Sequence, residues 1–252
     1  MDEQVYSFLL IGQSNMAGRG YMNEVEPIKN ENLYVLRNGR WVQMFAPLHW
    51  ERRMAGICLA ESFGEQCVKT YRRKIGLIPC ADGGSCLDQW VPGDVLFDHA
   101  VFQAKLAMRS STLAGVLWHQ GEADCMPERY PLYEEKCTAI FEAFRRELGL
   151  SDEVPFLVGG LGEFLKDRKE SPFLVNYPHV NAHLQSMAAH QPYIHYVPAE
   201  GIPSNPDNLH FSAAGLREFG NRYFEVFAGQ NRIIPVCETT GAALEMTEME
   251  KL

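Results

Sequence analysis

Ser14 stands where an apolar stretch stops abruptly, a setting that suits a catalytic nucleophile. The sequence reads VYSFLLIGQSNMAGRG over Val5–Gly20, so a hydrophobic strand is expected to end in a turn that carries Ser14 between two amide side chains, Gln13 and Asn15. A serine hydroxyl is a weak nucleophile and needs a general base, usually a histidine that a carboxylate orients. The stretch therefore predicts either a strand-to-helix turn alone or a turn that aims a nucleophile.

The base that best suits Ser14 lies far along the chain, in the segment DNLH over residues 207–210. A D-x-x-H spacing lets both side chains emerge from one loop. The carboxylate of Asp207 can then reach one ring nitrogen of His210 and leave the other for Ser14. The simpler interpretation is a turn before a helix that Ser212 caps, and the spacing by itself favours it. The two interpretations are compatible.

Ester hydrolysis also needs hydrogen-bond donors for the oxyanion that forms at the attacked carbonyl. The glycines of Gly83-Gly84-Ser85 follow a second apolar stretch and would let backbone N–H groups approach a ligand closely. Gln120, in the motif HQGEAD, can offer a side-chain amide. Each segment also has a plain interpretation, as a turn or as a loop hydrogen bond, so neither is diagnostic alone.

Glu122 of the same motif is a second carboxylate that competes with Asp207. It could orient His210, or it could hold the Ser14 turn or the substrate through hydrogen bonds. We favour the supporting role for Glu122, because the D-x-x-H pair already supplies an acid. Whether Glu122 shares the role of Asp207 stays open at this point.

Strand-like and helix-like stretches alternate along the chain and would position these residues. Apolar runs predict strands buried on both faces, over Val5–Ile11, Lys74–Ala81, Leu113–His119, Pro155–Gly160 and Tyr193–Pro198. Helical spacing of apolar residues predicts helices over Ile57–Tyr71, Val95–Arg109, Tyr130–Leu148, Val180–His190 and Ala213–Phe227. The pair Asn38-Gly39 is a hairpin signal and predicts a small antiparallel excursion between Leu33–Leu36 and Trp41–Met44.

Five such β–α units predict an α/β fold, a parallel sheet of about five strands with helices on both faces. In folds of this kind, ligands bind at the carboxyl ends of the strands. The segments that follow the expected strands are rich in glycine, amides and carboxylates, and they hold all the candidate residues above. The chemistry is therefore expected at that edge of the sheet.

The composition is that of a globular protein with an acidic surface. The chain has 252 residues and a formal net charge of −9, which argues against nucleic acid or an anionic membrane as a partner. We expect one domain over residues 1–236 and a polar tail over 237–252. Seven cysteines without a CxxC pair indicate a reducing compartment. Without a signal peptide or a membrane-spanning run, the sequence predicts a cytoplasmic protein, unless a leader was removed.

Two pairs of side chains are candidates for binding roles. Trp90 and Trp118 could line a sugar site, because aromatic faces suit pyranose rings. Burial is expected for Trp118 at the end of a strand, whereas Trp90, in a polar loop, is an even choice between burial and substrate contact. His179 and His183 are four residues apart, but no third ligand is evident, so a surface pair is favoured over a metal site.

Four motifs together resemble a known family. GQSNMAG, GGSCLDQW, WHQGEAD and DNLHFSAAG stand in this order and at wide spacings, as in SGNH (GDSL-type) hydrolases. The resemblance is narrower to the acetyl xylan esterase and sialate O-acetylesterase-like group called carbohydrate esterase family six, and it runs from Val5 to about Phe227. It implies a flavodoxin-like three-layer α/β/α fold and the removal of acetyl groups from sugar hydroxyls without a metal or other cofactor.

The resemblance also implies roles for individual residues. Ser14 matches the nucleophile, His210 the base and Asp207 the acid of a catalytic triad. The backbone N–H groups of Ser14 and Gly84 would form the oxyanion hole. Gln120 would complete it, at the position where the wider superfamily has an asparagine.

The sequence thus predicts a serine esterase that acts on an acetylated carbohydrate through an acetyl-enzyme intermediate. A sialate O-acetylesterase and a lipid-type or thioester hydrolase on the same scaffold are rivals, and the latter should bring an apolar acyl channel. A non-catalytic carbohydrate-binding protein is a rival from another class. The sequence does not set which sugar is bound or the oligomeric state, so a homo-oligomer stays open.

Overall fold

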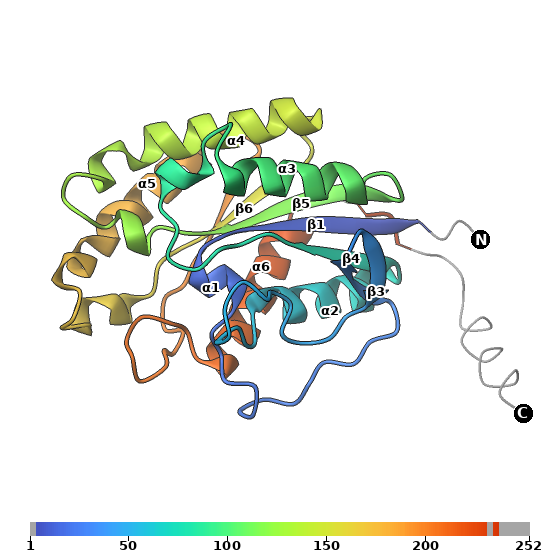
Figure 1. The fold of residues 1–252 in the computed structure, drawn as a ribbon, viewed down its shortest axis with the longest axis horizontal. Helices are drawn as coiled ribbons and strands as arrows, with labels where there is room; N and C mark the ends of the chain where they lie inside the picture. The colour runs from blue at the N-terminus through green and yellow to red at the C-terminus, as the bar shows by residue number, and fades with distance from the viewer. Residues whose placement is uncertain (1–3, 231–233, 237–252) are drawn as a thin grey trace, which may run out of the picture.

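One sheet of seven strands organises the described part of the chain (Figure 1). The computed structural model describes residues 4–230 and 234–236, so the tail expected over 237–252 lies outside the described residues. The strand order is β3-β2-β4-β1-β5-β6-β7, and all neighbours are parallel except β2 and β3. The strands are β1 (Val5–Gly12), β2 (Leu33–Arg37), β3 (Arg40–Gln43), β4 (Lys74–Pro79), β5 (Ser111–His119), β6 (Phe156–Gly159) and β7 (Ile194–Val197).

Helices cover both faces of the sheet and give three layers (Figure 1). One layer holds α2 (Leu59–Tyr71) and α6 (Ala213–Ala228), and the other holds α3 (Val95–Ala107), α4 (Tyr133–Leu148) and α5 (Tyr177–His190). A short helix, α1 (Ser14–Ala17), follows β1 directly. None of the described helices combines the length and the apolar character needed to cross a membrane.

Strand β1 is apolar at nearly every position because each of its faces meets a helical layer. Leu9 and Ile11 belong to the core cluster that packs under α3, α4 and α5. Phe8 and Leu10 belong to the cluster shared with α2 and α6. Alternate side chains of a strand point to opposite faces of the sheet. Because both faces of this central strand are buried, its sequence shows no alternation of polar and apolar residues.

The predicted α/β fold is confirmed, with more strands than the five expected. The five predicted strands lie in the spatial order second, first, third, fourth and fifth, which is the flavodoxin-like order. The hairpin also forms, with positive φ at Asn38 (49°) and Gly39 (73°). It is not a separate excursion, because β2 pairs in parallel with β4. The hairpin therefore extends the sheet to seven strands.

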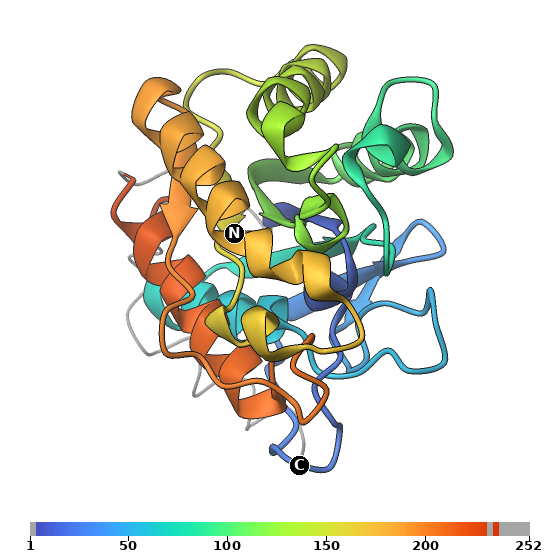
Figure 2. The same cartoon turned by 90° about the vertical axis from the view of Figure 1, so that its left-hand side faces the viewer.

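The carboxyl ends of the parallel strands meet at one edge of the sheet, which faces the viewer in Figure 2. In this strand order β4 lies on one side of β1 and β5 on the other. The connections that follow neighbouring strands therefore run in opposite directions beside β1. Such a switch point leaves a crevice outside the strand ends, where doubly wound proteins bind ligands. Helix α1 and Ser14 lie at this point.

A stability prediction follows from the contact between α2 and α6. Gly220 lies where these helices cross, and a Cβ atom there would collide with the Leu59 carbonyl oxygen and the Ser62 hydroxyl. We expect Gly220→Ala to lower the free energy of unfolding by roughly 1–3 kcal/mol, because packed helices must separate to admit the methyl group. Urea denaturation measures this change. Gly229→Ala, at the end of α6, is the matched control, because a Cβ atom there would make only ordinary van der Waals contacts at 3.4 Å and 3.6 Å; an equal loss in both variants would contradict the prediction.

Candidate active site

Ser14, His210 and Asp207 come together at the carboxyl edge. The His210 Nε2 atom lies 3.1 Å from the Ser14 Oγ atom, and the His210 Nδ1 atom lies 2.6 Å from Asp207 Oδ2. Because the carboxylate accepts at Nδ1, that nitrogen carries the proton and Nε2 is free to accept from the serine hydroxyl. The side chain of His210 is 15% exposed, so the ring is shielded yet reachable from solvent.

The end of β1 sets the position of Ser14. Gly12 has a φ of 127°, and a Cβ atom on it would collide with the carbonyl oxygen of His119 on β5. The next N–H, of Gln13, donates to that same carbonyl oxygen at 2.9 Å. A side chain at position 12 would force β1 and β5 apart, so only glycine lets the serine turn begin this close to β5.

Asp207 organises its own loop as well as the histidine ring. Its Oδ1 atom accepts the backbone N–H groups of Leu209 and His210, and Arg168 donates to its carbonyl oxygen at 2.6 Å. Burial acts to raise the pKa of Asp207, but the hydrogen bonds from the backbone of residues 209 and 210 and from the His210 ring outweigh it, so the pKa is lowered. Asp207 is therefore an ionised acceptor for His210 at neutral pH.

Asn15 joins the serine turn to the histidine loop. Its Nδ2 atom donates to the Leu209 carbonyl oxygen at 3.1 Å, and its Oδ1 atom accepts the Phe211 N–H at 3.1 Å. These two bonds bracket His210 along the chain. The residue after the proposed nucleophile thus fixes the backbone on both sides of the proposed base.

Glu122 supports Asn15 and does not contact the His210 ring. Its Oε1 atom accepts from Asn15 Nδ2 at 2.5 Å and lies 3.5 Å from the Nε2 atom of the buried His119. Burial acts to raise the pKa of Glu122, but the contacts with His119 and Asn15 outweigh it, so the pKa is lowered. The geometry thus favours Asp207 over Glu122 as the carboxylate that orients His210.

The candidate backbone donors lie beside the serine. The turn at residues 82–85 is held against the end of β1, because the Asp82 N–H donates to the Gly12 carbonyl oxygen at 3.0 Å. Gly84 has a φ of 82° and is exposed, with open space around it. Among the hydrogen bonds of the described residues, the N–H groups of Ser14 and Gly84 have no acceptor. Both are therefore free to donate to a ligand.

Gln120 does not fit the oxyanion role that the resemblance implies, and this expectation is corrected. Its side chain is fully buried, and its Nε2 atom donates to the Ser85 carbonyl oxygen at 3.1 Å and to Asp124 Oδ2 at 2.5 Å. Both amide hydrogens are thus taken by protein acceptors. Gln120 instead ties the turn that carries Gly84 to the segment after β5. Gln13 ties the serine turn to the same segment, since its Oε1 atom accepts the N–H groups of Gly121 and Ala123.

Trp90 is not a substrate residue in this structure, which corrects a second expectation. Its side chain is fully buried, its indole N–H donates to the Ser85 hydroxyl at 3.0 Å, and its ring packs edge-on against Trp118 at 5.6 Å. The loop around Trp90 is polar in sequence, but its 3-10 helix Leu87–Trp90 turns the indole into the core. Trp118 is buried as expected.

The two histidines with the spacing of metal ligands, His179 and His183, face other partners. His179 stacks on Tyr130 with ring centroids 4.6 Å apart, and His183 lies 3.2 Å from Glu134. Within residues 4–230 and 234–236, no three His, Cys, Asp or Glu side chains gather as a metal site would require. The polar groups around Ser14 are arranged for hydrogen bonding.

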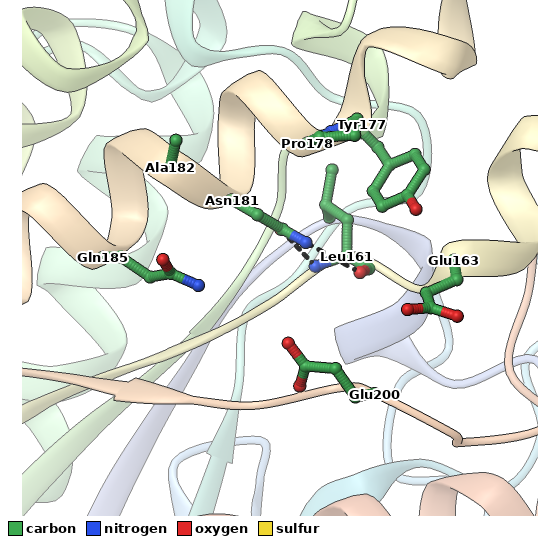
Figure 3. Close-up of a pocket in the computed structure, with 8 residues that line it drawn as sticks. All are labelled: Leu161, Glu163, Tyr177, Pro178, Asn181, Ala182, Gln185 and Glu200. Carbon is green, nitrogen blue, oxygen red and sulfur yellow. Dashed lines mark hydrogen bonds between the residues drawn. The ribbon is translucent and has the colours of Figure 1, made fainter.

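A polar cavity lies at the same edge, beyond β6 and β7 (Figure 3). Asn181 hydrogen bonds to the N–H and the carbonyl oxygen of Leu161 and so fixes one wall, while Glu163, Tyr177 and Glu200 point into the space. Burial raises the pKa of Tyr177, and the two glutamates raise it further, so its hydroxyl remains a donor. A second hollow shares Glu163 and reaches Ser204, which is hydrogen-bonded to Asn208 in the histidine loop.

Comparisons with known proteins agree with the fold. A probable carbohydrate esterase of Arabidopsis thaliana is 25% identical over 239 residues, which cover 84% of this chain and 86% of that protein. A crystal structure of an Arabidopsis thaliana protein matches with a TM-score of 0.78, at 22% identity, over 91% of this chain and 99% of that one. The crystal structure of NanS matches with a TM-score of 0.72, at 18% identity, over 90% and 97% of the two chains.

The family described as carbohydrate esterase, sialic acid-specific acetylesterase matches residues 4–229. The chain belongs to this family, whose members are ester hydrolases.

The contacts of the two carboxylates predict different effects of neutralising them. Asp207→Asn replaces the acceptor at His210 Nδ1 and favours the wrong ring tautomer, so we expect esterase kcat to fall by about 10²–10⁴-fold. Glu122→Gln keeps an acceptor for Asn15, so a loss below about tenfold is expected. Steady-state kinetics with p-nitrophenyl acetate measure both. Abolished turnover in Glu122→Gln with near-normal turnover in Asp207→Asn would reverse the assignment.

The lowered pKa of Glu122 predicts how that residue affects stability with pH. A carboxyl group whose pKa is lower in the folded than in the unfolded chain stabilises the fold at pH values above its pKa in the unfolded chain, which is near 4.5. That contribution is lost as the pH falls through the lower, folded value. We expect Glu122→Gln to be less stable than the wild type at pH 7, by roughly 1–3 kcal/mol, with the gap narrowing below about pH 4.5. Urea denaturation across pH measures the gap, and a gap that widens in acid would contradict the prediction.

Proposed function

We propose that this protein is a serine esterase that removes acetyl groups from the hydroxyls of carbohydrates, of the carbohydrate esterase family six type. The observation that carries the proposal is the continuous chain of hydrogen bonds from Asp207 through His210 to Ser14. Such a chain activates a serine hydroxyl that is otherwise a weak nucleophile. Family membership supports ester hydrolysis as the reaction.

In the proposed reaction, His210 Nε2 takes the hydroxyl proton as Ser14 Oγ attacks the acetyl carbonyl carbon. Asp207 holds the ring and stabilises the imidazolium that forms. The tetrahedral intermediate collapses as His210 returns the proton to the sugar oxygen, which leaves an acetyl-enzyme. A water molecule, deprotonated by His210, then attacks this ester, and His210 returns the proton to Ser14 Oγ as the bond to the acetyl group breaks and acetate leaves.

The negative charge on the carbonyl oxygen would be held by the N–H groups of Ser14 and Gly84. Neither group has a described acceptor, and both are anchored through the end of β1. Donors that are already oriented cost little reorganisation during the reaction, which makes them effective. Because Gln120 is engaged with Asp124 and Ser85, the proposed hole consists of backbone groups alone.

The surroundings of the site favour an uncharged sugar. The cavity in Figure 3 carries Glu163 and Glu200, and a carboxylate-bearing sugar such as sialic acid would be repelled there. Carboxylate, amide and phenol groups hydrogen bond well to sugar hydroxyls and poorly to an acyl chain. We therefore place acetylated xylo-oligosaccharides or related neutral glycans first. O-acetyl sialic acid comes second, and the family description, which names sialic acid, supports that substrate.

The central test is acetate release by the wild type and Ser14→Ala. We expect the wild type to release acetate from acetylated xylo-oligosaccharides faster than from O-acetyl sialic acid, and Ser14→Ala to lose at least about 10³-fold in kcat. Matched thermal unfolding of the two proteins controls for folding. Acetate release that survives in Ser14→Ala would rule out the nucleophile, and a preference for O-acetyl sialic acid would reverse the order of substrates.

A further inference from the structure

Trp50 is the one tryptophan of four with an indole ring turned to solvent. Its relative exposure is 65%, whereas Trp90 and Trp118 are fully buried. Trp41 is partly buried and its indole N–H donates to Ser110. Covering a large apolar side chain lowers the free energy. An exposed indole near a functional site therefore suggests a surface that a ligand covers.

The Trp50 ring is held in place although it is exposed. The Arg37 guanidinium lies 4.1 Å from the ring centroid, in a cation–π contact, and its Nη2 atom donates to the Pro47 carbonyl oxygen at 2.9 Å. The Phe45 ring is tilted against the indole at 6.1 Å. The indole is thus supported by protein on one side while most of its area stays open. A platform held in this way loses little conformational entropy when it binds a ligand.

The two residues after Trp50 anchor its loop to the active site. Glu51 forms a buried ion pair with Arg19 at 2.5 Å, and the same arginine donates to the carbonyl oxygen of Gly18, which ends α1. Arg52 pairs with Asp82 at 2.9 Å and reaches the Gly83 carbonyl oxygen at 3.4 Å. Asp82 and Gly83 are in the turn that presents Gly84. The Trp50 loop is therefore tied to both segments that carry the proposed nucleophile and oxyanion donor.

We infer that Trp50 is a sugar-binding platform for an uncharged oligosaccharide, on which a pyranose ring of the substrate stacks. This inference rests on the proposed function and extends it from an acetylated sugar to a chain of sugar units. The faces of pyranose rings present C–H groups, which pack well on the electron-rich face of an indole. The side chain of Arg52, two residues after Trp50, is 47% exposed and offers donors for sugar hydroxyls.

The platform and Ser14 contact different units of the glycan. Arg19 links Glu51, the residue after Trp50, to the Gly18 carbonyl oxygen at the end of α1. We infer that the sugar that stacks on Trp50 is a different unit from the one whose acetyl group reaches Ser14. It follows that the substrate spans at least two sugar units, and that small esters engage Ser14 without the platform.

Kinetics of Trp50→Ala on a long and a short substrate test the platform. We expect kcat/KM for acetylated xylo-oligosaccharides to fall roughly tenfold, mainly through a higher KM. The loss on p-nitrophenyl acetate should be several-fold smaller, because that ester does not extend to the platform. Trp50→Phe, which keeps an aromatic face, should recover most of the loss. Equal losses on both substrates, or no loss on the oligosaccharides, would overturn the inference.

Phe102→Ala is the matched control. Phe102 is 63% exposed and lies in α3, which covers the opposite face of the sheet from α2, so its removal should leave both kinetic constants within twofold. Thermal unfolding of all variants separates lost binding from lost folding.

Tryptophan fluorescence tests binding without any turnover. Titration of the wild type with deacetylated xylo-oligosaccharides should shift or quench the emission, since the solvent-exposed indole becomes covered. Trp50→Phe should abolish the response. A response in a protein that releases no acetate would leave the sugar platform standing while the proposed function fails. Acetate release that depends on Ser14, with no response to the oligosaccharide, would overturn the platform and leave the proposed function standing.

Discussion

The site depends on the close approach of two strand ends, Gly12 of β1 and His119 of β5. The two residues are partners in the parallel register, and the space between them excludes even a Cβ atom. The Gly12 carbonyl oxygen also receives the Asp82 N–H, so the turn that carries Gly84 is attached to the same point. One backbone contact thus fixes the distance between the serine turn, the segment after β5 and the turn after β4. This contact therefore sets the positions of the proposed nucleophile and the proposed oxyanion donors relative to each other.

A buried polar chain then fixes the fourth segment, the histidine loop. His119, Glu122 and Asn15 follow one another from β5 to the backbone around His210. Burying a carboxylate in this chain is costly unless its bonds are made, and the lowered pKa of Glu122 indicates that its contacts exceed the desolvation cost. Asp207 orients the ring itself. The two candidate carboxylates therefore have different contacts: Glu122 positions the histidine loop through Asn15, and Asp207 positions the imidazole ring of His210.

Much of this could be predicted from the sequence, because apolar runs, a hairpin signal and strand-end motifs report on local structure and on burial on both faces. The alternation of strands and helices predicted the fold class. Because the motifs follow the expected strands, they also predicted that Ser14, Asp207 and His210 lie at one edge of the sheet. The errors came from side-chain direction, which depends on tertiary contacts. Trp90 is in a polar loop, yet its indole is buried and donates to Ser85. Gln120 donates to Asp124 and Ser85, and no local sequence pattern predicts these two acceptors. Trp50 and Arg168 lie outside every motif, and only the folded chain places them at this edge.

The charge around the edge is uneven, and this bears on what the site can hold. On the β6–β7 side, Glu163 and Glu200 face a cavity, whereas on the β4 side Arg37 lies over an exposed indole and Arg52 pairs with Asp82. An anionic sugar would be attracted on one side and repelled on the other, while an uncharged glycan that crosses the edge can hydrogen bond to both. A crevice at a topological switch point suits such a ligand, because its walls come from different β–α units and can differ in chemistry while β1 stays fixed between them.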